Sequence, residues 1–367
     1  MPPPGPTPGA YAYQPYAYQP LRPVLPPVSD AVLKIPLGTR ELVRQSLDLL
    51  TRSDSGLRGP SFYIGFILLV TLAPVIVIIG LAVALGAPAT DAFEPYDPSA
   101  PVPLWPFWML LAFVPGICGY IAASVEAAAV ATAVIGGRVE GRPLGMRQSI
   151  AIARLRFWSI LGPRLLVNFV SGIVGLIVGV ILLAVFGLVA GDFINTGVSL
   201  LISLVISAPF VYVPAGVVLG EVGMMEAIER SFRLVMLRKR LAIVITLFGV
   251  FSQFIVAFGL SAGLDAVSRL LIGAGVVEDF PPVLVVPIVA ALVFALGTLT
   301  FLVEAIAAAP AVHAFAALTH YTHGLDYGRQ RPVKGTRLWD PWVTPGLAIG
   351  ALVGLLAMVG AVLTFPV

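Results

Sequence analysis

The chain has 367 residues, of which 58% are hydrophobic and 11% charged, and its mean hydropathy is +0.98. A soluble domain carries about 25% charged residues, so this composition indicates a polytopic membrane protein. The net charge of +3 could suit nucleic acid, but the positions of the basic residues favour membrane lipids instead. The single cysteine, Cys118, excludes a disulfide framework and a cysteine metal site.

Residues 1–33 form a segment rich in proline and tyrosine, with a tandem YAYQP at 11–20. Proline at this density opposes helix and sheet, so we expect a disordered cytoplasmic tail. The tail would be either a solvated spacer or a ligand for an aromatic-lined groove. Its start has no basic-then-apolar pattern, so we expect no cleaved signal peptide.

Seven apolar runs follow, each long enough to cross a bilayer as a helix. They lie at residues 62–86, 107–134, 165–190, 197–219, 241–263, 283–312 and 344–365. A short polar stretch at 191–197 separates the third run from the fourth, and we interpret these two runs as the arms of a hairpin.

Basic and acidic residues alternate between the loops that join these runs. All but one of the 22 lysines and arginines lie in 1–61, 135–164, 220–240 and 313–343, and the exception is Arg269. The other loops hold Asp91, Glu94, Asp97, Asp192, Asp265, Glu278 and Asp279. The positive-inside rule then places the N-terminus in the cytoplasm and the C-terminus outside an inner or plasma membrane.

Three basic stretches, at 37–51, 144–158 and 220–240, each precede an apolar run and share one pattern. Aligned on glycine, they contain LGTRELVRQSLDLL, LGMRQSIAIARLRF and VGMMEAIERSFRLV. We expect three pseudo-repeats, each an amphipathic surface helix followed by a transmembrane hairpin. The repeats would occupy 34–136, 137–219 and 220–325, and 326–367 would hold a cytoplasmic loop and a final span.

The third stretch has the clearest amphipathic pattern. Its expected apolar face comprises Met224, Met225, Ala227, Ile228, Phe232, Val235 and Met236. On the other face, Glu226 and Glu229 each precede an arginine by four residues, and each such pair is worth ~0.2–0.5 kcal/mol. The basic residues expected at the membrane surface are Arg230, Arg233, Arg238, Lys239 and Arg240. The last three would close the helix at its negative dipole end, beside anionic headgroups. A helix in the membrane interface explains this pattern better than a water-exposed linker does.

The segment from Pro214 to Leu234 reads P-x4-L-G-E-x-G-x2-E-A-I-x-R-S-F-x-L. It resembles the signature of the glycerophosphoryl diester phosphodiesterase membrane-domain family and of related polytopic proteins, and the resemblance covers most of 36–325. It implies a shared membrane fold. In members that are enzymes, activity resides in a separate barrel domain, and this chain ends two residues after the seventh run. We therefore expect no enzymatic activity and no cofactor.

Two carboxylates interrupt the apolar runs in matching surroundings, Glu126 in SVEAAA and Glu304 in LVEAIA. A charge at such depth costs ~2.5–3.5 kcal/mol or more, so each is a candidate transport or proton site. If paired, the two could share a proton or hold a cation. Alternatively, each could accept hydrogen bonds from an arginine or from the backbone of a neighbouring surface helix.

Three histidines, His313, His320 and His323, would share one helix face if the sixth run continues that far. With Asp326 they could be imagined as a metal site, although the spacing is weak evidence. We favour interfacial histidines beside lipid headgroups and expect no metal.

These patterns predict an all-α bundle of about seven spans. We expect an integral membrane protein that acts as scaffold or accessory factor in envelope or lipid-linked processes. The alternative is a small-solute or ion permease that uses Glu126 and Glu304. Expected partners are membrane lipids, a membrane protein or a second copy of the chain.

Overall fold

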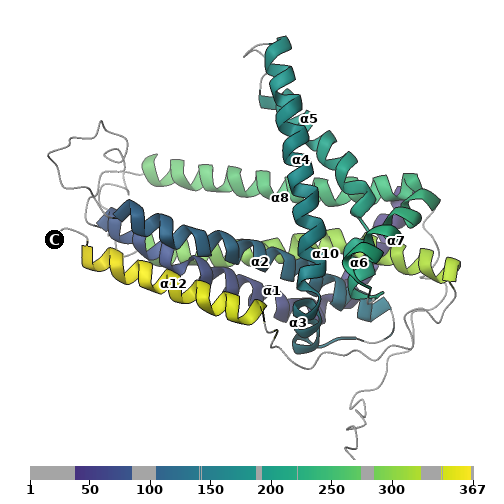
Figure 1. Cartoon of the computed structure of the whole chain (residues 1–367), viewed down its shortest axis with the longest axis horizontal. Helices are drawn as coiled ribbons and strands as arrows, with labels where there is room; N and C mark the ends of the chain where they lie inside the picture. Colours follow the sequence, from purple (N-terminus) through teal and green to yellow (C-terminus); the bar gives the residue numbers. More distant parts are fainter. Residues whose placement is uncertain are drawn as a thin grey trace, which may run out of the picture.

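The computed structural model describes residues 38–84, 105–139, 141, 143–186, 192–220, 222–273, 285–323, 340 and 342–364. These residues form helices, and no strand occurs among them. Six helical segments are long and apolar enough to cross a membrane. The predicted all-α class is therefore confirmed, and the six apolar helices fit a multi-pass membrane protein. Figure 1 shows how the helices are arranged. The tail at 1–33 and the residues 326–339 lie outside the described residues.

The described residues of all seven predicted apolar runs lie mostly on helices. The long helices are α1 (Thr39–Ala84), α2 (Trp105–Val139), α4 (Phe157–Phe186), α5 (Asp192–Ser207), α8 (Lys239–Gly273), α10 (Val285–His323) and α12 (Val343–Thr364). The shorter ones are α3 (Met146–Leu155), η2 (Ala208–Phe210), α6 (Val213–Val218) and α7 (Met224–Leu237). The six candidate spans lie in α1, α2, α4, α5 with α6, α10 and α12. α8 covers the run at 241–263, and a seventh crossing there stays a prediction.

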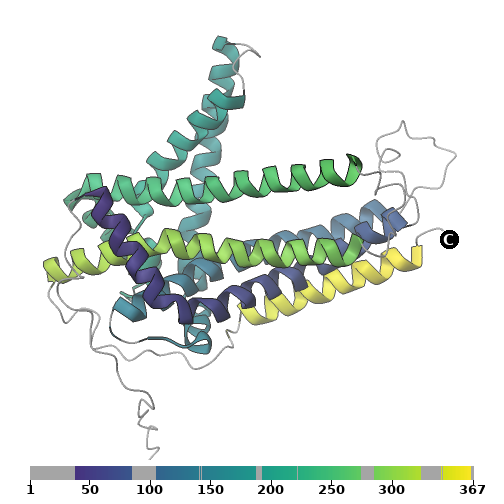
Figure 2. The same cartoon turned by 180° about the vertical axis from the view of Figure 1, so that it is seen from behind.

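The long helices are arranged in two groups. Helices α1, α2, α10 and α12 pack together along one axis, and α8 contacts α10 (Figure 1, Figure 2). The hairpin of α4 and α5 stands at a steep angle to them and meets them at its base. The apolar stretch of α4 is not buried against the described protein. The hairpin is thus held at one end only.

Two prolines interrupt the second arm of this hairpin. Pro209 and Pro214 cannot donate a backbone hydrogen bond, so the run predicted at 197–219 breaks into α5, η2 and α6. The hydroxyl of Ser231 on α7 donates to the Pro209 carbonyl at 2.6 Å and accepts from the Tyr212 amide at 3.3 Å. The amphipathic helix α7 therefore stabilises the break.

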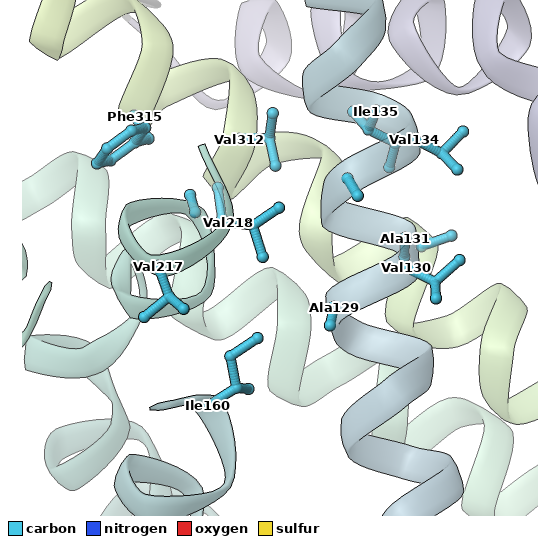
Figure 3. Packing of buried hydrophobic residues seen from close by; sticks show 14 of the residues in the cluster. Ala129, Val130, Ala131, Val134, Ile135, Ile160, Val217, Val218, Val312 and Phe315 are labelled. Atoms are coloured by element: carbon cyan, nitrogen blue, oxygen red, sulfur yellow. The ribbon is translucent and has the colours of Figure 1, made fainter. Parts of the chain in front are cut away.

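The main core lies where α2 meets α6 and α10. Figure 3 shows small and β-branched side chains on more than one side of α2: Ala129 lies toward Ile160 of α4, whereas Val130 and Val134 point away from it. The labelled residues of α2 are Ala129, Val130, Ala131, Val134 and Ile135. Small side chains allow close helix approach, which drives association inside a bilayer, where burial from water contributes little.

The three predicted surface helices begin in the same way. In each, the amide four residues after the glycine donates to that glycine's carbonyl, at 3.0 Å for Gly38, 3.0 Å for Gly145 and 2.9 Å for Gly223. The donors Leu42, Ser149 and Ala227 are all buried, and so are the residues four further on, Ser46, Ala153 and Ser231. The first of the three is not a separate surface helix, because α1 continues without a break from Thr39 to Ala84, and the threefold repeat of whole units stays a prediction.

The helix at 220–240 ends earlier than expected. α7 stops at Leu237, Arg238 leaves helical geometry, and α8 begins at Lys239. The expectation that Arg238, Lys239 and Arg240 close one helix is therefore wrong for the last two, which lie in the first turn of α8. The physical reason is the change of direction at Arg238, whose carbonyl accepts from the Ala242 amide at 3.1 Å.

Glycines permit close contact between helices at some positions and not at others. An added Cβ on Gly354 of α12 would lie 2.7 Å from Pro74 of α1, and one on Gly297 of α10 would lie 2.7 Å from the backbone of Gly65 in α1. Gly172, Gly175 and Gly179 of α4 have nothing within 4 Å. These three glycines therefore bring no described helix close to α4.

Candidate functional site

Glu126 is the most deeply buried carboxylate among the described residues. It lies in α2 with 1% of its side chain exposed, and its Oε1 accepts from the Tyr63 hydroxyl at 3.0 Å and from Arg154 Nε at 2.9 Å. Arg154 Nη2 also donates to the Tyr63 hydroxyl at 2.6 Å. A charged acid, its countercharge and a phenol thus form a closed triangle inside the helix bundle.

Arg154 reaches this triangle from the last turn of α3, the second predicted surface helix. Burial acts to lower the pKa of its guanidinium, but the charge interactions and hydrogen bonds with Glu126 and Tyr63 together outweigh burial and raise that pKa above its ordinary value. Its Nη1 donates to the Thr344 hydroxyl of α12 at 3.0 Å. Asp340 caps the same helix, since its Oδ1 accepts from the Val343 amide at 2.8 Å. One arginine therefore connects α1, α2, α3 and α12.

Glu304 has an arginine of its own. Arg164, near the start of α4, donates through Nη2 to Glu304 of α10 and through Nη1 to the Ser124 carbonyl of α2 at 3.1 Å. The pair is less enclosed than the first, with 30% of the arginine side chain and 12% of the glutamate side chain exposed. It fixes the base of the α4–α5 hairpin to the bundle.

A cavity of about 340 Å³ adjoins the second pair, between the hairpin and helices α2, α8 and α10. Its polar lining residues are Thr132, Arg164, Asn168, Ser203, Ser207, Thr246, Gln253 and Glu304. Glu126 does not line it. The cavity is within the size range of small-ligand sites, which combine an apolar wall with a few polar groups.

The structure does not join the two predicted carboxylates. No hydrogen bond connects Glu126 with Glu304 among the described residues, and each pairs with a different arginine. This geometry matches the alternative interpretation of the sequence, in which each acid accepts hydrogen bonds from an arginine. The transport role of the two acids stays a prediction, and of the two only Glu304 lines the described cavity.

Sequence reasoning missed the partner residues Tyr63, Arg154 and Arg164. The two arginines were counted only as topological markers of the segment 135–164. A usable signal existed, because Arg164 directly precedes an apolar run, and a charge in that place needs a partner.

Helix α7 agrees with its predicted polar face. Glu226 bonds Arg230 and Glu229 bonds Arg233, each at 2.5 Å. On the predicted apolar face, Ala227 is buried against protein while Met225 and Met236 are exposed, at 73% and 59%. Exposed methionines on a helix that a basic stretch follows suit an interface with lipid. The positions of Arg238, Lys239 and Arg240 are also exposed.

The histidines do not form a described site. α10 continues to His323, so the three histidines belong to one helix as the sequence predicted. His313 is fully buried, however, so the expectation that it faces headgroups is wrong. His313 lies on the buried side of α10, where neighbouring protein covers its side chain. The side chains of His320 and His323 and residue Asp326 lie outside the described residues. Among the side chains that are described, no group of His, Cys, Asp or Glu could hold a metal ion.

Comparison of the chain with protein-family models, with curated proteins and with solved structures finds no match. The resemblance of 214–234 to the phosphodiesterase membrane-domain family therefore stays a prediction.

Proposed function

We propose that this chain is a non-catalytic integral membrane protein that acts as scaffold or accessory factor in a lipid-linked process. The observation that carries the proposal is the pairing of both intramembrane acids with arginines, Glu126 with Arg154 and Glu304 with Arg164. A proton or ion carrier needs a carboxylate that can release one positive partner and take another. Here the partners are protein side chains that also bond neighbouring helices.

Exposed apolar surface supports contact with lipid or with a membrane partner. On α4, Phe169 and Leu176 are 68% and 69% exposed, and on α7 Met225 is 73% exposed. Such faces are stable only against hydrocarbon or another apolar surface. The proposed location is an inner or plasma membrane with the basic segments in the cytoplasm.

A second candidate, a small-solute or ion permease, is favoured by one observation. The cavity beside Glu304 is lined by polar residues of several helices and reaches a charged pair. For this candidate Glu304 would be the coupling residue, and Glu126 would hold the bundle together.

Proteoliposomes that contain the full chain and a trapped pH indicator test the two candidates. The scaffold proposal predicts that an imposed pH gradient decays no faster than in empty liposomes. Decay that is faster with the wild-type chain, and that Glu304→Gln abolishes without lowering the melting temperature, would overturn the proposal in favour of the permease. Lipids and proteins that co-purify in mild detergent would then identify the process.

A further inference from the structure

Four polar side chains around the cavity make no hydrogen bond with any described residue. They are Asn168 of α4, Ser203 and Ser207 of α5, and Gln253 of α8. Each lies on a helix that is otherwise strongly apolar, so polar groups without partners are costly there unless water or a ligand bonds them. Elsewhere in these helices the Ser252 hydroxyl of α8 bonds the Phe248 carbonyl at 2.7 Å, whereas the Ser171 hydroxyl of α4 has no partner among the described residues.

The charges at the cavity cancel. Arg164 and Glu304 are the only charged residues among the described ones that line it, and they bond each other. An anionic ligand would have to approach the Glu304 carboxylate, and a cationic ligand would have to approach the Arg164 guanidinium. The amide and hydroxyl groups of the other residues can both donate and accept. This set of groups suits an uncharged ligand that bears several hydroxyls.

The surroundings of the cavity suit an amphiphile. Asn168 and Gln253 are exposed, so the polar side can be reached from outside the protein. Beside Gln253 on α8, Phe254 and Phe258 stack with ring centroids 6.2 Å apart and are 37% and 66% exposed. Val205 of α5 is 70% exposed. The exposed apolar residues would accommodate an acyl chain, and the polar cavity next to them would accommodate the headgroup.

We propose that this cavity binds a neutral, hydroxyl-rich group, such as the sugar headgroup of a glycolipid or the same sugar free in solution. The inference rests on the proposed role in a lipid-linked process and names the chemical class of the ligand. Asn168 of α4 and Gln253 of α8 would bond the hydroxyls, and the Arg164–Glu304 pair would line the same cavity without adding net charge.

The test uses the full chain in phosphatidylcholine nanodiscs that contain glucosyl-diacylglycerol, with native mass spectrometry of the lipid retained after release. We expect retained glycolipid in the wild type and a loss of about tenfold in the Asn168→Leu/Gln253→Leu double variant, because two hydrogen bonds disappear. Ser252→Ala is the matched control, since this neighbouring hydroxyl bonds its own helix, and it should retain the glycolipid.

Further measurements distinguish the headgroup of a glycolipid from a free sugar and from an anionic lipid. Protection of the melting temperature by free glucose, lost in the same double variant, would assign the site to a soluble sugar. Preferential retention of phosphatidic acid, or equal glycolipid retention by wild type and double variant, would overturn the proposal. Failure here with no decay of the pH gradient would leave the scaffold proposal intact, whereas Glu304-dependent decay would overturn that proposal whatever the lipid result.

Discussion

Arg154 Nε and Glu126 Oε1 lie 2.9 Å apart, although their residues belong to different helices and the glutamate is 1% exposed. The chain turns back between α2 and α3, which brings the end of a predicted surface helix against the acid of the preceding span. A basic residue counted as a marker of membrane topology is thereby also a structural partner of the buried acid.

Glu126→Gln should lower the stability of the folded chain by about 3–5 kcal/mol, because it leaves the Arg154 charge buried without its countercharge. Thermal unfolding in detergent, followed by loss of monomeric protein on size exclusion, measures the change. The double variant Glu126→Gln/Arg154→Gln should be more stable than the sum of the single losses predicts. Strict additivity of the two losses would contradict the pairing.

Tyr63→Phe removes a hydroxyl that donates to Glu126 and accepts from Arg154. We expect a loss of about 1–3 kcal/mol, smaller than that of Glu126→Gln, because the ion pair itself remains. The same unfolding measurement applies. A loss as large as that of Glu126→Gln would mean that the phenol, rather than the charge pair, holds the cluster.

Ser231→Ala should destabilise the junction of α7 with the broken arm by about 1–3 kcal/mol, since the Pro209 carbonyl and the Tyr212 amide would lose their bridging hydroxyl. Proteolysis of the junction at 208–223, compared between variant and wild type, is the measurement. Ser252→Ala serves as control and should leave the cleavage rate unchanged.

Gly354→Ala and Gly172→Ala form a matched pair on two candidate spans. The new Cβ at 354 would press on Pro74 at 2.7 Å, so we expect a loss of about 1–3 kcal/mol. At 172 there is open space, and alanine should be neutral or stabilise the helix by about 0.5–1 kcal/mol. Equal melting temperatures for the two variants would contradict the packing of α12 on α1.

Single cysteines in a Cys118→Ser background test the predicted topology. Arg233→Cys on α7, where the arginine side chain is 76% exposed, should react with a membrane-impermeant maleimide only in inside-out vesicles. Asp97→Cys should react only from the opposite face. Labelling of both from one side would contradict the orientation derived from the positive-inside rule.

The sequence predicted helices well and tertiary partners poorly. Apolar length located every long helix, and the i,i+4 pairs of α7 followed from spacing alone, because both depend on residues close together in the chain. Arg154 and Glu126 meet through a change of direction between helices, which no local pattern encodes. The glycines of α4 show the same limit, because their spacing permits another helix to pack closely but does not determine whether one is present.

Thr344 has a consequence for biosynthesis. Its hydroxyl is the acceptor for Arg154 Nη1, and it stands in the last of the described helices to leave the ribosome. While the chain is being made, α1, α2 and α3 can assemble the triangle of Tyr63, Glu126 and Arg154. The Arg154 guanidinium lacks its Thr344 acceptor until α12 is in place. The cluster is therefore complete only after α12 has been made and has packed against the other helices.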